Sequence, residues 1–145
     1  MSALPADIRA PLMCPSAQPD MADAVILGVR GGSADVPFIS YLERPEPVSA
    51  ELLALSQPLL PTEVYRFAAR CEEHACRHFD GRNCNLATRI VQILPAVADA
   101  LPPCKIRHEC RWFQQEGRSA CLRCPQVITQ VEDAGEQFRF VATPR

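Results

Sequence analysis

The sequence has no long apolar segment and no strong net charge. No run of roughly eighteen apolar residues occurs, which excludes a transmembrane helix. Residues 1–19 are broken by prolines and lack a basic segment followed by an apolar one, so we expect no secretory signal and a cytoplasmic protein. The formal net charge is −2, so the composition indicates neither disorder nor nucleic acid as a partner.

The motifs of common enzyme classes are also missing. Gly31-Gly32 lies outside any G-x-G-x-x-G or P-loop pattern, and we interpret it as a turn. There is no Ser–His–Asp arrangement, no paired carboxylates in an apolar setting, and no C-x3-C-x2-C of the radical type. We predict no catalytic residues. The sequence favours an electron carrier or accessory protein, and an enzyme only if a bound metal keeps an open position.

Cysteine, in contrast, is abundant, with 8 residues in a chain of 145. Without a secretory signal, thiols are expected to stay reduced, and reduced thiols at short spacing are typical metal ligands. Four of them fall close together, and the last pair forms a C-x-x-C followed by Pro125. These four, which we call the downstream set, are Cys104, Cys110, Cys121 and Cys124. Sulfur ligands select zinc, copper(I) or iron–sulfur clusters.

A second group of cysteines precedes the first. Three of them occur between residues 71 and 84, and Asp80-Gly81 is a turn signal that would bend the chain back between the last two. A fourth ligand is needed, and Cys14 is followed by Pro15, which repeats the Cys-Pro dipeptide of the downstream set. The resulting upstream set is Cys14, Cys71, Cys76 and Cys84.

Two metal chemistries fit these residues. Two [4Fe–4S] clusters, one on each set, use every cysteine with none left over. Zn²⁺ is the alternative: His108 could complete a Cys3His site in the downstream set in place of Cys104, and His74 or His78 could join the upstream set. Zinc ribbons usually offer two C-x-x-C-like knuckles, whereas this chain has one. The wider gaps between its other cysteines favour the larger cofactor.

The cysteines and Cys-Pro dipeptides of residues 71–125 resemble those of small bacterial proteins with two iron–sulfur clusters. The resemblance implies one-electron transfer to or from a protein redox partner. Of the ferredoxin run C-x2-C-x2-C-x3-C-P only the final C-x2-C-P is matched, so the ferredoxin fold is not implied. Two further functions remain open: a redox or oxygen sensor that loses its cluster on oxidation, and a zinc-stabilised adaptor in a larger assembly. Five basic and two acidic residues between Cys104 and Cys124 suit an anionic cluster.

We predict an α+β fold in one small irregular domain, 1–145, with an N-terminal β-hairpin and short helices arranged around two metal centres. Its parts are an arm, hairpin and connector (1–60), a cysteine-rich metal-binding core (61–131) and a tail (132–145).

The pattern of residues predicts several local elements. The hairpin spans residues 23–42 with its turn at 30–35, and residues 44–47 form a rigid connector. We expect a helix at 50–55 capped by Ser49, and a second one from Pro61 whose apolar stripe includes Cys71. Further predicted elements are a helix from Asn85 that ends or kinks at Pro95, a helix over 106–116 that ends at Gly117, and a strand at 137–141.

Overall fold

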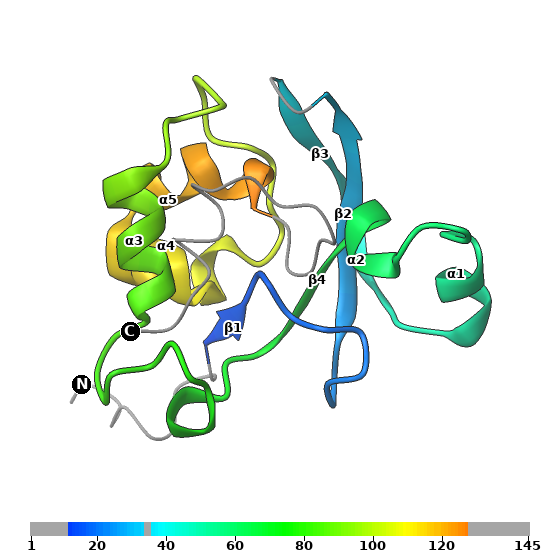
Figure 1. Ribbon diagram of the computed structural model, residues 1–145, viewed down its shortest axis with the longest axis horizontal. Coiled ribbons are helices and arrows are strands. Elements are labelled where there is room, and N and C mark those ends of the chain that lie inside the picture. Colours follow the sequence, from blue (N-terminus) through cyan, green and yellow to red (C-terminus); the bar gives the residue numbers. More distant parts are fainter. Residues whose placement is uncertain (1–11, 34–35, 128–145) are drawn as a thin grey trace, which may run out of the picture.

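The computed structural model describes residues 12–33 and 36–127. They form an antiparallel sheet of four strands in the order β1-β4-β2-β3, together with several short helices (Figure 1). The strands are β1 (Met13–Cys14), β2 (Val25–Gly32), β3 (Pro37–Pro47) and β4 (Tyr65–Arg70). The α-helices are α1 (Ala50–Ala54), α2 (Pro61–Val64), α3 (Asn85–Ile93), α4 (Arg111–Glu116) and α5 (Arg118–Arg123). The 3₁₀ turns are η2 (Glu73–Ala75), η3 (Arg107–Glu109) and η4 (Cys124–Gln126). The predicted α+β class is confirmed.

The predicted hairpin is β2 and β3, which pair from Gly32 and Pro37 down to Val25 and Pro47. Strand β3 is longer than expected, because residues 44–47, predicted as a connector, continue it. The register shifts between Ile26, which pairs with Glu46, and Gly28, which pairs with Tyr41. Strand β3 therefore has more residues than β2 between these two pairs.

Gly28 is required by close packing in this hairpin. A Cβ atom at position 28 would lie 2.6 Å from Ile39 Cγ2 and 2.7 Å from the Ser40 carbonyl oxygen. We expect Gly28→Ala to lower the free energy of unfolding by about 1–3 kcal/mol, because a backbone atom cannot move away easily. Gly31→Ala is the matched control: its Cβ would meet only the half-exposed ring of Phe38, which can rotate. Urea unfolding of both variants tests this, and equal stabilities would contradict it.

Residues 61–71 correct the sequence prediction. The expected helix with Cys71 on its apolar stripe is wrong: α2 ends at Val64 and residues 65–70 form strand β4. Five of the six side chains of β4 are buried, because the strand is covered on both faces. A strand buried on both faces loses its simple alternation of apolar and polar residues, which is why the stripe imitated a helix.

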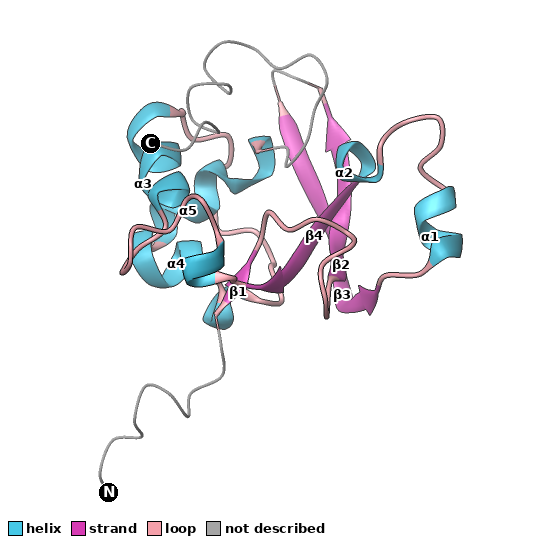
Figure 2. Ribbon diagram, turned by 60° about the horizontal axis from the view of Figure 1, so that its bottom comes forward, coloured by secondary structure: helices cyan, strands magenta, loops and turns pink. Residues whose placement is uncertain are grey.

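The sheet separates two apolar cores. Helices α3, α4 and α5 lie on one side of the sheet and α1 on the other, as both views show (Figures 1 and 2). Tyr65 and Phe67 of β4 belong to the core toward α1, whereas Ala68 belongs to the core toward α3, α4 and α5. Alternate side chains of a strand point to opposite faces. The core toward α3, α4 and α5 contains the buried thiols Cys84, Cys110 and Cys124.

Several helix ends lie where the sequence predicts. Ser49 caps α1 by accepting a hydrogen bond from the Leu52 amide, and α3 ends at Ile93, before Pro95. Gly117, at φ +69°, ends α4 as expected. The helix predicted over 106–116 is instead η3 followed by α4, with extended backbone at Cys110 between them. The predicted strand at 137–141 and the tail lie outside the described residues.

Candidate metal centres

The four cysteines of the downstream set line one cavity. Cys104 precedes η3, Cys110 separates η3 from α4, Cys121 lies in α5 and Cys124 begins η4. The other walls of the cavity are mostly apolar: Pro15, Tyr41, Pro102, Arg107, Trp112, Phe113 and Ala120. Chain turns at 104–110 and 117–124 thus bring to one place thiols that are up to twenty residues apart in sequence.

The pKa values of these thiols reflect their burial and their mutual proximity. The pKa of Cys104 is raised to about 11, mainly by burial, with a smaller contribution from the nearby sulfurs of Cys124 and Cys121. Burial also raises the pKa of Cys110, followed by repulsion from Cys124. Hydrogen bonds from backbone amides act in the opposite direction, from Ile106 to Cys104 and from Phe113 and Trp112 to Cys110. The free thiols of Cys104 and Cys110 are therefore neutral at pH 7, and a metal would have to displace their protons.

Two arginine side chains contact the sulfur atoms of the downstream set. Arg66 of β4 donates from Nη1 to Cys124 Sγ at 2.8 Å, and Arg107 of η3 donates to the sulfur of Cys121, which lowers the pKa of that thiol. Burial is the larger effect on Cys121 and raises its pKa. Charged donors to sulfur stabilise a thiolate. Two charged donors thus contact sulfur atoms of the downstream set, in opposition to the effect of burial.

Two buried donors at this cavity have no partner in the described part of the chain. They are Trp112 Nε1 and Arg107 Nε, and both residues line the cavity. Buried donors are usually hydrogen-bonded, so each orphan needs an explanation. The inorganic sulfides of an iron–sulfur cluster accept hydrogen bonds. The residues present therefore fit such a cluster.

The upstream set comes from β1 and from the segment after β4, and its Cys84 belongs to the core toward α3, α4 and α5. Cys14 lies in β1, and Cys71 directly follows β4, with its amide bonded to the Leu12 carbonyl at 2.8 Å. The pKa of Cys14 is raised to about 12. Burial is the main cause, and the nearby sulfurs of Cys84, Cys71 and Cys76 contribute smaller increases. A hydrogen bond from the Ser16 amide lowers this pKa. The structure thus brings Cys14 to the three cysteines that follow β4, although more than fifty residues separate them in sequence.

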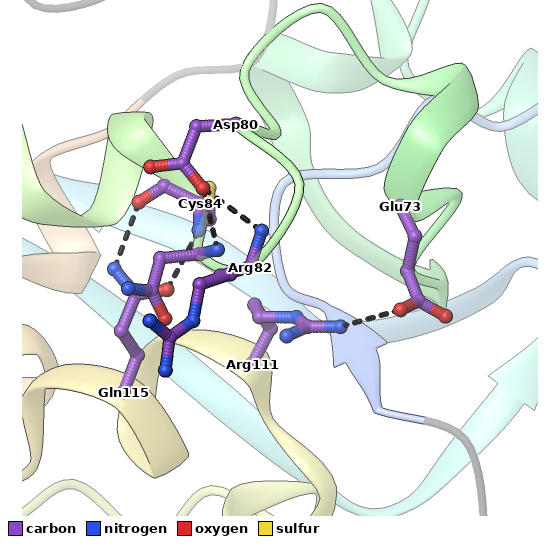
Figure 3. A network of polar contacts seen from close by, with 7 residues as sticks. Glu73, Asp80, Arg82, Cys84, Arg111 and Gln115 are labelled. Carbon is purple, nitrogen blue, oxygen red and sulfur yellow. Dashed lines mark hydrogen bonds and ion pairs between the residues drawn. The ribbon is translucent and has the colours of Figure 1, made fainter. Parts of the chain in front are cut away.

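Cys84 is fixed by polar contacts from two directions (Figure 3). Gln115 of α4 accepts from the Cys84 amide at 2.7 Å and donates to its carbonyl at 2.8 Å. The turn before it is closed by Asp80, whose carboxylate accepts from the Arg82 and Asn83 amides. The amides of Ala87 and Leu86, in the first turn of α3, lower the pKa of Cys84 against the larger effect of burial.

The two sets of cysteines are linked by neighbouring residues. Cys14 belongs to the upstream set, while the next residue, Pro15, lines the downstream cavity. Cys14 and Pro15 are adjacent residues, so their Cα atoms are about 3.8 Å apart across a trans peptide bond. Met13 pairs with Cys110 in a parallel β-bridge, and Arg111 forms an ion pair with Glu73 at 3.4 Å, which joins α4 to η2 (Figure 3). The arm and these contacts hold both sets in one unit.

His108 and His78, two of the histidines considered as zinc ligands, are placed less favourably. His108 is exposed and does not line the downstream cavity. His78 Nδ1 lies 3.1 Å from Arg89 Nη2. Among residues 12–33 and 36–127, no three histidine, cysteine, aspartate or glutamate side chains are grouped so that they could hold a single metal ion.

Comparison with known proteins finds no matching family model, no similar curated protein and no similar solved structure. In the described ranges, no helix has the length and apolar character needed to cross a membrane.

The sequence did not single out Arg66, Tyr41 or Pro15 as site residues. One signal for Arg66 was present: it stands between Tyr65 and Phe67 in an otherwise apolar run. An arginine in that position must either reach solvent or find a buried partner. The partner lies fifty-eight residues away, at Cys124.

Proposed function

We propose that this protein binds two [4Fe–4S] clusters, one on the upstream set and one on the downstream set, and passes single electrons to or from a partner protein. The observation that carries the proposal is the gathering of four thiols around the downstream cavity. The proximity of Cys14 to Cys84, Cys71 and Cys76, each of which raises the pKa of Cys14, supports the second centre. All eight cysteines are free, as expected in a reducing compartment, and we place the protein in the cytoplasm.

The spacing of the thiols favours clusters over zinc. Zinc–sulfur bonds are about 2.3 Å, so four tetrahedral sulfurs would lie only about 3.8 Å apart. A four-iron cube holds its cysteine sulfurs farther apart, because iron and sulfide atoms stand between them. In the described part of the chain the four downstream thiols line one cavity, and no three histidine, cysteine, aspartate or glutamate side chains are grouped so that they could hold a single ion. Buried arginine and amide donors also suit a cofactor that carries net negative charge.

Electron transfer is favoured over catalysis by the ligand count and by the distance between the centres. Four thiols for each cluster leave no open iron, and the reaction needs none. Cys14 belongs to the upstream set and the adjacent Pro15 lines the downstream cavity, which supports two neighbouring centres. Such proximity allows an electron that enters at one centre to reach the other without a change in fold.

Voltammetry of anaerobically purified protein tests the proposed function. We expect reversible one-electron reduction at both centres, with an unchanged hydrodynamic radius. Iron loss in air within minutes, a changed radius and no reversible wave would reject the carrier and favour the sensor. Colourless protein that contains zinc would reject both and favour the structural adaptor.

A further inference from the structure

A buried arginine contacts a proposed cluster ligand directly. Arg66 is only 2% exposed, and its Nη1 lies 2.8 Å from Cys124 Sγ. Its Nη2 donates to the Cys124 carbonyl oxygen at 2.6 Å and also to that of Val127. No carboxylate forms an ion pair with Arg66 within the residues that the structure describes.

Such an arginine needs a negative charge nearby. The guanidinium group remains protonated in proteins, and burying its charge without a partner is strongly unfavourable. Two carbonyl oxygens provide only partial compensation, and a neutral thiol provides little. A metal-bound thiolate at Cys124 provides the charge at hydrogen-bond distance. The position of Arg66 is thus explained if Cys124 is a ligand.

The strand geometry shows why Arg66 faces the metal site. In β4 the side chains alternate, so Tyr65 and Phe67 enter the core toward α1 while Arg66 points to the opposite face. On the neighbouring strand β2, Arg30 donates to the Val127 carbonyl at 3.1 Å and to the Pro125 carbonyl at 3.4 Å. Both arginines hold the segment that carries Cys124, but only Arg66 contacts the sulfur.

We propose that Arg66 positions Cys124 and, by its charge, gives the downstream centre the higher reduction potential of the two. This inference rests on the proposed function. A nearby cation stabilises the more negative, reduced cluster, and hydrogen bonds to the sulfurs act in the same direction. The low dielectric of a buried site strengthens the effect. A protein donor gives one electron to the upstream centre. That electron then passes to the downstream centre, so the upstream centre is reoxidised and the downstream centre is reduced.

The upstream centre offers a contrast. Its thiols receive hydrogen bonds from neutral backbone amides, Ser16 to Cys14 and Leu86 and Ala87 to Cys84. Its nearest ion pair, Arg111 with Glu73, has no net charge, and the Glu73 side chain is 55% exposed. Solvent and salt screen such charges. Backbone donors thus act at both centres, whereas the buried guanidinium contact acts at the downstream one.

Redox titration followed by electron paramagnetic resonance tests the inference. We expect Arg66→Met to lower the potential of one centre and to leave the other unchanged, with full iron content. Arg66→Lys keeps the charge and should restore most of the wild-type potential. Arg30→Met is the matched control, since Arg30 also donates to the segment that carries Cys124 but does not contact its sulfur, and its shift should be smaller.

The outcomes separate this inference from the proposed function. Wild-type protein without iron and sulfide would reject the function itself. Full iron with both potentials unchanged in Arg66→Met, or with both shifted equally, would reject only the role of Arg66. A shift in Arg66→Lys as large as that in Arg66→Met would show that packing, not charge, is responsible.

A second measurement does not depend on the Arg66 variants folding. In reduced protein labelled with ¹⁵N at the arginine guanidinium groups, pulsed paramagnetic resonance should detect two coupled classes of nitrogen, from Arg66 and Arg107. Only the Arg107 class should vanish in Arg107→Lys. No coupling, or a single class that vanishes in that variant, would overturn the assignment.

Discussion

Replacing Cys110 with serine is expected to remove the downstream centre and leave the upstream one, so iron and sulfide per chain fall by roughly half. Serine keeps the size of the side chain but is a poor ligand to iron, and Cys110 is buried in the wall of the cavity. The sequence has one tryptophan, Trp112, which is 1% exposed and lines the same cavity. A nearby cluster quenches tryptophan fluorescence, so its loss should make Cys110→Ser markedly brighter than the wild type.

The controls for this variant come from the same chain. Cys71→Ser should also lose half of the iron, but with a smaller change in fluorescence, because Cys71 does not line the cavity around Trp112. His108→Ala should keep full metal content, since His108 is exposed and lies outside that cavity. Loss of metal in His108→Ala, together with retention in Cys104→Ser, would contradict the cluster and support a Cys3His zinc site.

Replacing Cys14 with serine should remove the upstream centre while the strand that carries it stays in place. Strand β1 is held by its pairing with β4, Met13 to Arg70 and Cys14 to Ala69, and these contacts use backbone atoms alone. We therefore expect loss of roughly half of the iron, as in Cys71→Ser, with a circular dichroism spectrum close to that of the wild type. Iron analysis and circular dichroism of both variants make the comparison.

The downstream centre is an internal control for Cys14. Pro15 lines the downstream cavity, so a displaced arm would also change that centre. An unaltered downstream signal in Cys14→Ser would show that only a ligand was lost. If Cys14→Ser retains two full centres with unchanged spectra, Cys14 is not a ligand. The fourth position would then belong to His74, His78 or an exchangeable group, and an open iron would make catalysis possible.

Local signals in the sequence were sufficient for several elements. The hairpin follows from alternating apolar residues on either side of a glycine turn, and Ser49 and Gly117 mark the helix ends at which they occur. These features depend on neighbours within a few residues. The strand at Tyr65–Arg70 depends on contacts far away, with β1 and β2 on its two sides, and sequence periodicity alone assigned it to a helix.

The sequence grouped the cysteines by spacing; in the structure the downstream set lines one cavity and Cys14 lies near the other upstream cysteines, but the role of both sets as ligands stays a prediction. Cys14 illustrates what spacing can supply. The need for a fourth sulfur pointed to Cys14, and its pairing with Ala69 places it beside β4. Arg66 illustrates what spacing cannot supply. Its partner Cys124 is distant in sequence, and the contact exists only because β4 passes beside η4.

Analysis of iron, acid-labile sulfide and zinc in anaerobically purified wild-type protein, with Mössbauer spectroscopy after ⁵⁷Fe labelling, tests the central claim most directly. Two [4Fe–4S] clusters predict brown protein with about eight irons and about eight sulfides per chain, and spectra typical of four-iron cubes. Colourless protein that carries zinc, without iron or sulfide, would contradict the account.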